Sequence, residues 1–187
     1  MTGSPAPEVP RRAVFLDRDG VLNRAVMRGG RPFSPASAEE TELLEGVEAA
    51  CRALKAAGFL LICVTNQPDI ARRTRTRAEV EAINEKLKSA LGLDDVRMCP
   101  HDDGDGCACR KPKPGLLLDA ARDFDIDLKS SIMVGDRWRD VEAGKQAGCR
   151  TVFVDHGYAE ERPAGADFVC SGLQDALAWI NGSPNGP

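Results

Sequence analysis

The chain has 187 residues, of which 42% are hydrophobic and 29% are charged, and its net charge is −4. One domain of this length can bury a full core, and the composition excludes a disordered, collagen-like or coiled-coil chain. The negative charge argues against a dedicated nucleic-acid binder. The sequence has no run of the ~20 apolar residues that a membrane helix needs, and no apolar secretion signal is visible. We therefore expect a cytoplasmic protein.

Short apolar runs alternate with helical patterns along the chain. Runs rich in β-branched and apolar side chains predict strands at 13–16, 59–65, 132–134 and 151–154. Apolar residues spaced three and four apart, several followed by a glycine, predict helices at 47–57, 77–91, 115–124, 138–147 and 173–180. Their order predicts an α/β fold, a doubly wound parallel sheet, in one domain over 13–180 between loose tails at 1–12 and 181–187.

Acidic residues directly follow two of the predicted strands. Asp17 and Asp19 come after the first strand, and Asp136 comes after the strand at 132–134. Ligands of doubly wound sheets bind outside the carboxyl ends of the strands, so we expect these acids to converge. Converging carboxylates repel one another unless a cation neutralises them, and Mg²⁺ prefers such oxygen ligands. The alternative for Asp19 and its following glycine is a solvated turn, and the alternative for Asp136 is a helix cap. Asp140, one helical turn later, is a candidate to hold a metal-bound water.

Polar residues of two other segments are expected at the same edge of the sheet. Thr65 and Asn66 end the second predicted strand, and Lys111 precedes the helix at 115–124 in the sequence Arg-Lys-Pro-Lys-Pro-Gly. The prolines restrain the chain around this lysine, whose charge can balance the acids. A solvated basic run is the alternative for Lys111.

Four side chains that bind soft metals lie within eleven residues: Cys99, His101, Cys107 and Cys109. Three thiolates and one imidazole match a closed tetrahedral Zn²⁺ site, which leaves no open position for catalysis. A disulfide is disfavoured in a cytoplasmic chain, and free thiols beside a surface histidine are the remaining alternative. We therefore predict a structural zinc loop that fixes the chain just before Lys111. The other four cysteines stand among apolar neighbours and are expected to be buried thiols.

The motif Asp17-x-Asp19-Gly, followed by Thr65, Lys111 and Asp136, resembles the four motifs of the haloacid dehalogenase (HAD) superfamily. The resemblance covers about residues 13–155 and implies a phosphatase. It implies that Asp17 is the nucleophile, which forms an aspartyl-phosphate, and that Asp19 is the general acid and then the base. It further implies that Thr65 binds the transferring phosphoryl group and that Lys111 steadies Asp17 and the phosphate. The implied Mg²⁺ ligands are Asp17, the backbone carbonyl of Asp19, and Asp136.

The zinc loop followed by Arg110-Lys111-Pro resembles a zinc-bearing HAD subgroup without a large cap domain. That subgroup includes phosphatases of heptose bisphosphate and of histidinol phosphate. The resemblance implies that Asn66, Gln67 and Arg110 bind substrate. Two features depart from the heptose pattern: Pro-Asp follows Gln67, and the segment 24–37, whose Gly-Gly pair predicts a small hairpin flap, lacks the usual Gly-Tyr.

We expect a phosphatase that uses Mg²⁺ and Zn²⁺ and acts on a small sugar phosphate. The favoured substrate is heptose 1,7-bisphosphate, cleaved at position 7. Histidinol phosphate or another metabolite phosphate is the alternative, and an inactive zinc-stabilised binding module is the third.

Guanidinium groups pair bidentately with phosphate, so a bisphosphate is favoured by four arginines expected in the pocket walls: Arg28, Arg31, Arg72 and Arg110. The basic run at 72–77 is either a phosphate-attracting rim or a solvated helix start. Trp138 is expected to pack on its helix, with contact to the substrate as the alternative. The expected partner is the metabolite alone, with no nucleic acid and no membrane, and the expected state is a monomer.

Overall fold

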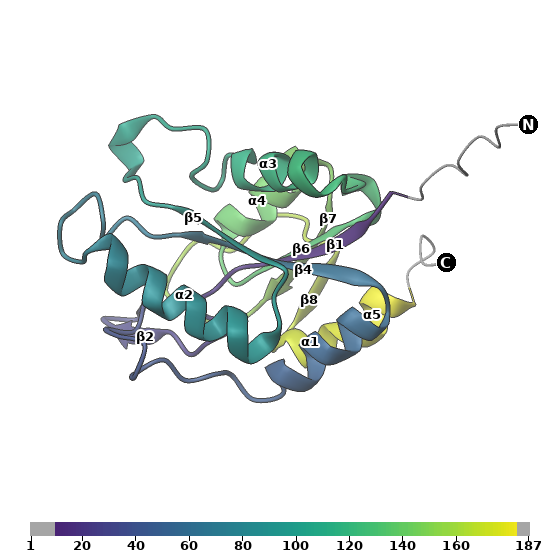
Figure 1. Ribbon diagram of the computed structural model, residues 1–187, viewed down its shortest axis with the longest axis horizontal. Coiled ribbons are helices and arrows are strands. Elements are labelled where there is room, and N and C mark those ends of the chain that lie inside the picture. Colours follow the sequence, from purple (N-terminus) through teal and green to yellow (C-terminus); the bar gives the residue numbers. More distant parts are fainter. Residues whose placement is uncertain (1–9, 183–187) are drawn as a thin grey trace, which may run out of the picture.

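The computed structural model describes residues 10–182, which form a six-stranded sheet with helices on both faces (Figure 1). The spatial order is β5-β4-β1-β6-β7-β8, and all neighbouring pairs are parallel. The bounds are β1 Arg12–Leu16, β4 Phe59–Asn66, β5 Asp95–Cys99, β6 Ile132–Gly135, β7 Arg150–Val154 and β8 Phe168–Cys170. The chain runs from β1 outward through β4 and β5, and then crosses over to β6, β7 and β8 on the other side. The predicted α/β fold with a doubly wound parallel sheet is therefore confirmed.

Two apolar cores, one on each face of the sheet, hold the helices in place. The first face carries α1 (Val47–Ala56), α2 (Arg77–Leu91) and α5 (Leu173–Asn181), and the second carries α3 (Gly115–Phe124) and α4 (Trp138–Ala147). Alternate residues of β1 contribute to the two cores, with Leu16 in the first and Phe15 in the second. Because both faces are covered, the inner strands are nearly continuous apolar runs, which made them recognisable in the sequence.

Local capping signals set the ends of α2. The Glu79 N–H donates to the Thr76 hydroxyl at 3.3 Å, and the Thr76 N–H donates to the Glu79 carboxylate at 2.7 Å. This capping box satisfies two N–H groups that the first helical turn leaves free. At the other end Gly92 has a left-handed conformation with φ +62°. The other helices also agree with their predicted ranges to within one residue.

Two edge strands and both ends of the domain differ from the predictions. The sequence did not predict β5 or β8, because β5 alternates polar and apolar residues at the sheet edge and β8 has only three residues. The predicted tail at 1–12 is too long, since Arg12 belongs to β1 and Arg11 forms a bridge with Ile126. At the other end α5 includes Asn181. The tail predictions for 1–9 and 183–187 lie outside the described residues.

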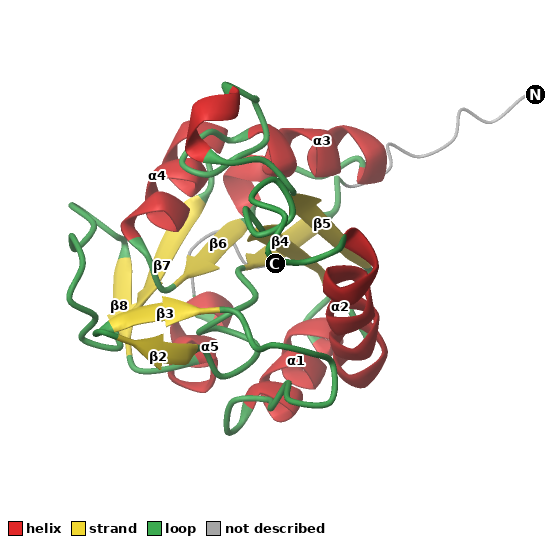
Figure 2. Cartoon of the chain, turned by 90° about the vertical axis from the view of Figure 1, so that its left-hand side faces the viewer, coloured by secondary structure: helices red, strands yellow, loops and turns green. Residues whose placement is uncertain are grey.

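A small antiparallel hairpin lies beside the carboxyl ends of the sheet strands (Figure 2). It consists of β2 (Val26–Arg28) and β3 (Arg31–Phe33), joined by Gly29 and Gly30 at φ +57° and +75°. This is the flap predicted from the Gly-Gly pair. Two short 3₁₀ turns complete the fold, η1 (Asp103–Asp105) and η2 (Leu128–Ser130). In the described part of the chain, no helix combines the length and the apolar character needed to span a bilayer.

Candidate active site

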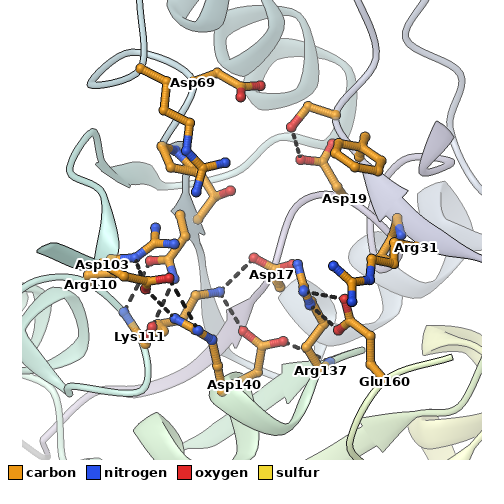
Figure 3. A pocket seen from close by; sticks show the side chains of 18 residues that line it. Asp17, Asp19, Arg31, Asp69, Asp103, Arg110, Lys111, Arg137, Asp140 and Glu160 are labelled. Carbon is orange, nitrogen blue, oxygen red and sulfur yellow. Dashed lines mark hydrogen bonds and ion pairs between the residues drawn. The ribbon is translucent and has the colours of Figure 1, made fainter. Parts of the chain in front are cut away.

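The carboxyl ends of β1, β4 and β6 bring the predicted catalytic residues to one edge of the sheet. Asp17 follows β1, and its N–H donates to the Val134 carbonyl of the neighbouring strand β6 at 2.9 Å. Thr65 lies near the end of β4, and Asp136 follows β6 directly. A pocket of about 330 Å³ opens here, and both Asp17 and Lys111 line it (Figure 3).

The Lys111 ammonium is buried and donates three short hydrogen bonds. Its Nζ lies 2.6 Å from Asp17 Oδ1, 2.6 Å from Asp140 Oδ1 and 2.7 Å from the Val64 carbonyl. Burial alone would lower the pKa of Lys111, but the charges of Asp140 and Asp17 outweigh it and raise the pKa above its usual value. The lysine is therefore charged and has all three protons in use.

Asn66 holds the backbone of Lys111 from both sides. Its Oδ1 accepts from the Lys111 N–H at 3.1 Å, and its Nδ2 donates to the Lys111 carbonyl at 3.0 Å. The side chain lines the pocket, but its amide is occupied by the protein. In this structure Asn66 therefore fixes the segment that carries the lysine, whereas the resemblance implied a direct substrate contact.

Three carboxylates meet beside this lysine and form a candidate cation site. One oxygen atom from each of Asp17, Asp136 and Asp140 lies within 4.8 Å of the others. Asp136 is buried, and neither of its oxygens has a hydrogen-bond partner of regular geometry among the described residues. Burial and the charges of Asp17 and Asp140 raise the pKa of Asp136 well above its usual value. A buried, unpartnered carboxylate requires a proton or a cation, and oxygen donors of this kind fit Mg²⁺.

The Asp17 carboxyl has opposing influences on its ionisation. Burial is the largest and raises its pKa, the Lys111 charge lowers it, and the Asp140 charge raises it again. The resulting pKa is about 6. A cation at the three acids would favour the ionised form that a nucleophile requires.

Two glycines allow the acids to lie against the backbone. A Cβ on Gly20, which has φ +90°, would lie 2.0 Å from Oδ2 of Asp136. A Cβ on Gly135 would lie 2.0 Å from the Cβ of Asp140. No side chain fits at either position without displacing an acid of the site, which explains the glycine in each strand-end motif.

Asp19 lies apart from the three acids and is surrounded by donors. Its oxygens accept from Arg18 at 2.9 Å, Asn23 at 2.9 Å, Ser34 at 2.7 Å and Gln67 at 3.2 Å. Burial raises its pKa, but the Arg18 charge and these hydrogen bonds outweigh burial and lower it. In this state the carboxylate is ionised, so it must acquire a proton before it can act as a general acid. Its side chain is not among the clustered acids, which leaves only its carbonyl for the implied role toward Mg²⁺.

Gln67 links the predicted phosphate-binding threonine to the flap. Its Nε2 donates to the Thr65 hydroxyl at 2.8 Å and to Asp19, and its Oε1 accepts from Ser34 at 3.1 Å. The side chain is buried and does not line the pocket. Gln67 therefore orients Thr65 and Asp19 in this structure rather than facing substrate.

The four predicted zinc ligands come together before Lys111. The Cys99 sulfur lies 3.7 Å from that of Cys107 and 3.2 Å from that of Cys109. Nδ1 of His101 lies 3.5 Å from the Cys99 sulfur and 3.3 Å from the Cys109 sulfur. In a tetrahedral site with Zn–S bonds of ~2.3 Å, the sulfurs would lie ~3.7 Å apart. The donor set and its spacing thus fit one Zn²⁺. Of the remaining cysteines, Cys170 is only half-buried, whereas the other three are buried as predicted.

Arginines form the outer wall of the pocket, and all but Arg31 form ion pairs with acids. Five line it: Arg31, Arg72, Arg110, Arg137 and Arg139. Arg72 donates to Asp102 at 2.6 and 2.7 Å. Arg137 donates to Glu160 at 2.8 and 2.5 Å (Figure 3). Of the basic run at 72–77, only Arg72 reaches this wall.

Other predicted residues lie elsewhere. Arg28 does not line the pocket, and its guanidinium lies 5.5 Å from the centre of the Phe33 ring, so its predicted place in the wall is wrong. Arg75, from the basic run, donates to the carbonyls of Ser34 and Pro35 and so holds the base of the flap in place. Trp138 is half-buried in an adjoining hollow, under the guanidinium of Arg139 at 5.2 Å.

Sequence reasoning missed several residues of the outer pocket: Asp103, Arg137, Arg139 and Glu160. Asp103 belongs to a stretch that reads as a polar turn, and Glu160 lies in a loop with no motif. The sequence did offer one signal for Arg137 and Arg139: they alternate with the acids Asp136 and Asp140, which were already assigned to the site.

Comparison with known proteins identifies the class to which this fold and site belong. The HAD-hydrolase-like family matches residues 108–176. The chain is 38% identical over 151 residues to a D-glycero-beta-D-manno-heptose-1,7-bisphosphate 7-phosphatase of Bordetella bronchiseptica, covering 78% of this chain and 82% of the relative. It is 38% identical over 178 residues to the enzyme of the same name from Yersinia pestis, covering 87% and 92%. The chain therefore belongs to the HAD-like phosphatases, and it is an enzyme of that class.

Solved structures agree with this assignment. The crystal structure of D,D-heptose 1.7-bisphosphate phosphatase from B. bronchiseptica, complexed with magnesium and phosphate, has a TM-score of 0.78 and 35% sequence identity. The match covers 90% of this chain and 97% of that one. A putative HAD-like phosphatase from Mesorhizobium loti has a TM-score of 0.75 and 30% identity and covers 100% and 92%. The predicted superfamily resemblance is thus confirmed.

Proposed function

We propose that the chain hydrolyses the phosphate ester at position 7 of D-glycero-D-manno-heptose 1,7-bisphosphate through an aspartyl-phosphate on Asp17. One observation carries the chemistry: the buried Lys111 bridges Asp17 and Asp140 beside the unpartnered Asp136, at a pocket whose outer wall is rich in arginine. The relatives named for this substrate, together with that wall, support the choice of a bisphosphate.

Phosphoryl transfer depends mainly on positioning and charge neutralisation. Asp17 presents a carboxylate oxygen for attack while Lys111 holds the other, which fixes the direction of approach. Mg²⁺, held by Asp17, the Asp19 carbonyl and Asp136, with Asp140 beside it, would neutralise the charge of the phosphate. The two hydrogen bonds from Asn66 to the Lys111 backbone keep the Lys111 ammonium positioned next to Asp17.

We assign the proton transfers to Asp19 and the phosphate contact to Thr65. Asp19 lies near the pocket and can exchange the donors that surround it for the leaving oxygen of the substrate. A proton taken up with the substrate would then pass to that oxygen, and the resulting carboxylate would activate water for hydrolysis of the aspartyl-phosphate. Thr65, oriented by Gln67, offers its hydroxyl proton to the transferring phosphoryl group.

Zinc at the four-ligand loop completes the proposal. It would fix the loop from which Arg110 and Lys111 emerge, without taking part in the chemistry. Thiols that hold zinc must stay reduced, which supports a cytoplasmic location. One chain supplies every residue assigned here, so we propose that a monomer is sufficient, which sedimentation of the active enzyme will test.

A phosphate-release assay tests the substrate. We expect both anomers of heptose 1,7-bisphosphate to be hydrolysed in preference to heptose 7-phosphate and to histidinol phosphate, with phosphate lost from position 7. A higher kcat/KM for histidinol phosphate would reassign the substrate, because that compound has no second anion and carries a cationic amine. Hydrolysis of none of the four, by protein that contains zinc and is supplied with Mg²⁺, would contradict the proposal.

A further inference from the structure

Asp103 of the zinc loop holds two pocket arginines that come from different parts of the fold. Its Oδ1 accepts from Arg110 Nε at 2.8 Å and from Arg139 Nη1 at 2.6 Å, and its Oδ2 accepts from Arg139 Nη2 at 3.4 Å. Arg110 directly precedes Lys111, whereas Arg139 lies in the first turn of α4. Arg110 also donates to the His101 carbonyl at 3.1 Å, within the zinc loop. The zinc loop thus brings the two guanidinium groups together.

This arrangement leaves positive charge toward the pocket. Arg72 and Arg137 each form a bidentate pair, with Asp102 and Glu160 respectively. Arg110 and Arg139 both pair with Asp103, and Arg110 also lies 4.0 Å from Asp102. Three guanidinium groups therefore share two carboxylates, and because Arg72 engages both oxygens of Asp102, the unbalanced positive charge lies at Arg110 and Arg139. Of the arginines in ion pairs at this wall, these two are therefore best suited to receive an anion.

The positions of the three side chains agree with a role in binding. The side chains of Arg110 and Arg139 are 12% and 29% exposed and line the pocket, whereas that of Asp103 is 57% exposed. Because the Asp103 carboxylate is exposed to water, its ion pairs contribute little to folding stability, so stability alone does not account for the three-residue cluster. Hydrogen bonds from both arginines lower the pKa of Asp103, which therefore stays ionised and keeps its hold on them.

We infer that Arg139 is a specificity-determining residue that binds, together with Arg110, the second phosphate of the substrate, the one that is not cleaved. Asp103 is the positioning residue for both guanidinium groups. This inference rests on the proposed function and extends it, since the motifs that predicted Arg110 give no role to Arg139 or Asp103. The ligand class is a phosphate dianion attached to a sugar.

The test measures how much the second phosphate improves the substrate. For each variant, kcat/KM is determined for heptose 1,7-bisphosphate and for heptose 7-phosphate, and their ratio is the gain from the second phosphate. We expect Arg139→Gln to reduce this ratio about tenfold, mainly through KM for the bisphosphate, with little change for the monophosphate. Asp103→Asn should reduce the ratio several-fold while zinc content stays at one per chain.

Matched controls come from an exposed ion pair of the same residue types on α3. Arg122 and Asp119 lie 2.9 Å apart with exposed side chains, and Arg122→Gln and Asp119→Asn should leave the ratio unchanged. A wild-type ratio well above one that survives in Arg139→Gln overturns this inference and leaves the proposed function intact. A wild-type ratio near one, with both compounds hydrolysed, also overturns this inference but leaves hydrolysis at position 7 intact, whereas hydrolysis of neither compound contradicts the proposed function itself. A larger ratio in Asp103→Asn would mean that the carboxylate only masks positive charge, and would overturn its role in positioning.

Discussion

At the scale of single residues, opposing charges act on Asp17. The Lys111 ammonium contacts it and stabilises its charge, whereas the nearby acids Asp136 and Asp140 oppose that charge. A neutral amide at this position would keep the shape of the side chain and lose both the nucleophile and a cation ligand.

We therefore expect Asp17→Asn to lower kcat by about 1,000-fold or more, a loss of ~4 kcal/mol in transition-state stabilisation. Far-ultraviolet circular dichroism should show an unchanged fold, and the exposed variant Asp119→Asn serves as the control. Residual activity above about a tenth of wild type would correspond to a loss of only ~1.4 kcal/mol and would contradict a nucleophilic role.

The pKa of about 6 for Asp17 predicts how Mg²⁺ binding depends on pH. A carboxyl whose folded pKa is raised contributes stability at low pH, and this contribution is lost as pH rises through 6 in the metal-free protein. Mg²⁺ must displace the proton below that pH and meets an ionised carboxylate above it. The increase in Tm caused by Mg²⁺ should therefore be larger at pH 7.5 than at pH 5. NaCl of equal ionic strength controls for screening, and equal shifts at the two pH values would contradict the prediction.

Gly135 tests how closely the acids are packed against the backbone. A Cβ there would meet Asp140 at 2.0 Å, so Gly135→Ala should displace that carboxylate and its bond to Lys111. We expect a loss of ~1–3 kcal/mol in the free energy of unfolding, measured by urea denaturation, together with a fall in kcat. Gly104 has no atom within 4 Å of the corresponding Cβ position, and Gly104→Ala should be nearly neutral for stability. Equal stability of the two variants would show that Asp140 can move freely.

At the scale of elements, the zinc loop joins β5 to the segment that carries Lys111. Cys99 ends β5 and is buried in the core, while Cys107 and Cys109 lie on the far side of η1. Without a metal this connection would rest on the polar turn and on the ion pairs of Asp102 and Asp103, because no strand or helix of regular length spans it.

Cys107→Ser should therefore reduce both zinc content and thermal stability. Structural zinc contributes directly to folding, so we expect Tm to fall by several degrees and Lys111 to lose its position, with a fall in kcat. Cys170→Ser changes a half-buried thiol outside the loop and provides the matched control. Absence of zinc from freshly purified, reduced wild-type protein, measured by elemental analysis, would refute the structural-zinc site.

At the scale of the whole molecule, the sequence predicted those parts whose signal is local. Buried strands such as β4 are apolar until their last two residues, and metal ligands such as the Cys99–Cys109 set are close in sequence, so both were found. The edge strand β5 escaped because its burial depends on one neighbour only. The contacts of Asn66 and Gln67 were also not predicted, because the hydrogen-bond partners of a buried amide are groups that only the folded chain brings close to it. The same reason hid Asp103, whose two arginines lie seven and 36 residues away.

The grouping of charges around Asp17 has a consequence for how substrate arrives. Four carboxylates, those of Asp17, Asp19, Asp136 and Asp140, face two buried cations, Lys111 and Arg18, and one divalent ion would balance the remaining two negative charges. The inner site with its metal is then electrically neutral and exerts little long-range pull on a phosphate dianion. That pull comes from the outer wall, where five arginines face four acids, Asp69, Asp102, Asp103 and Glu160, and leave one positive charge in excess. Capture and chemistry therefore depend on separate sets of charges. Raising the ionic strength should lower kcat/KM for the bisphosphate, by screening the wall, while kcat at saturation stays nearly constant.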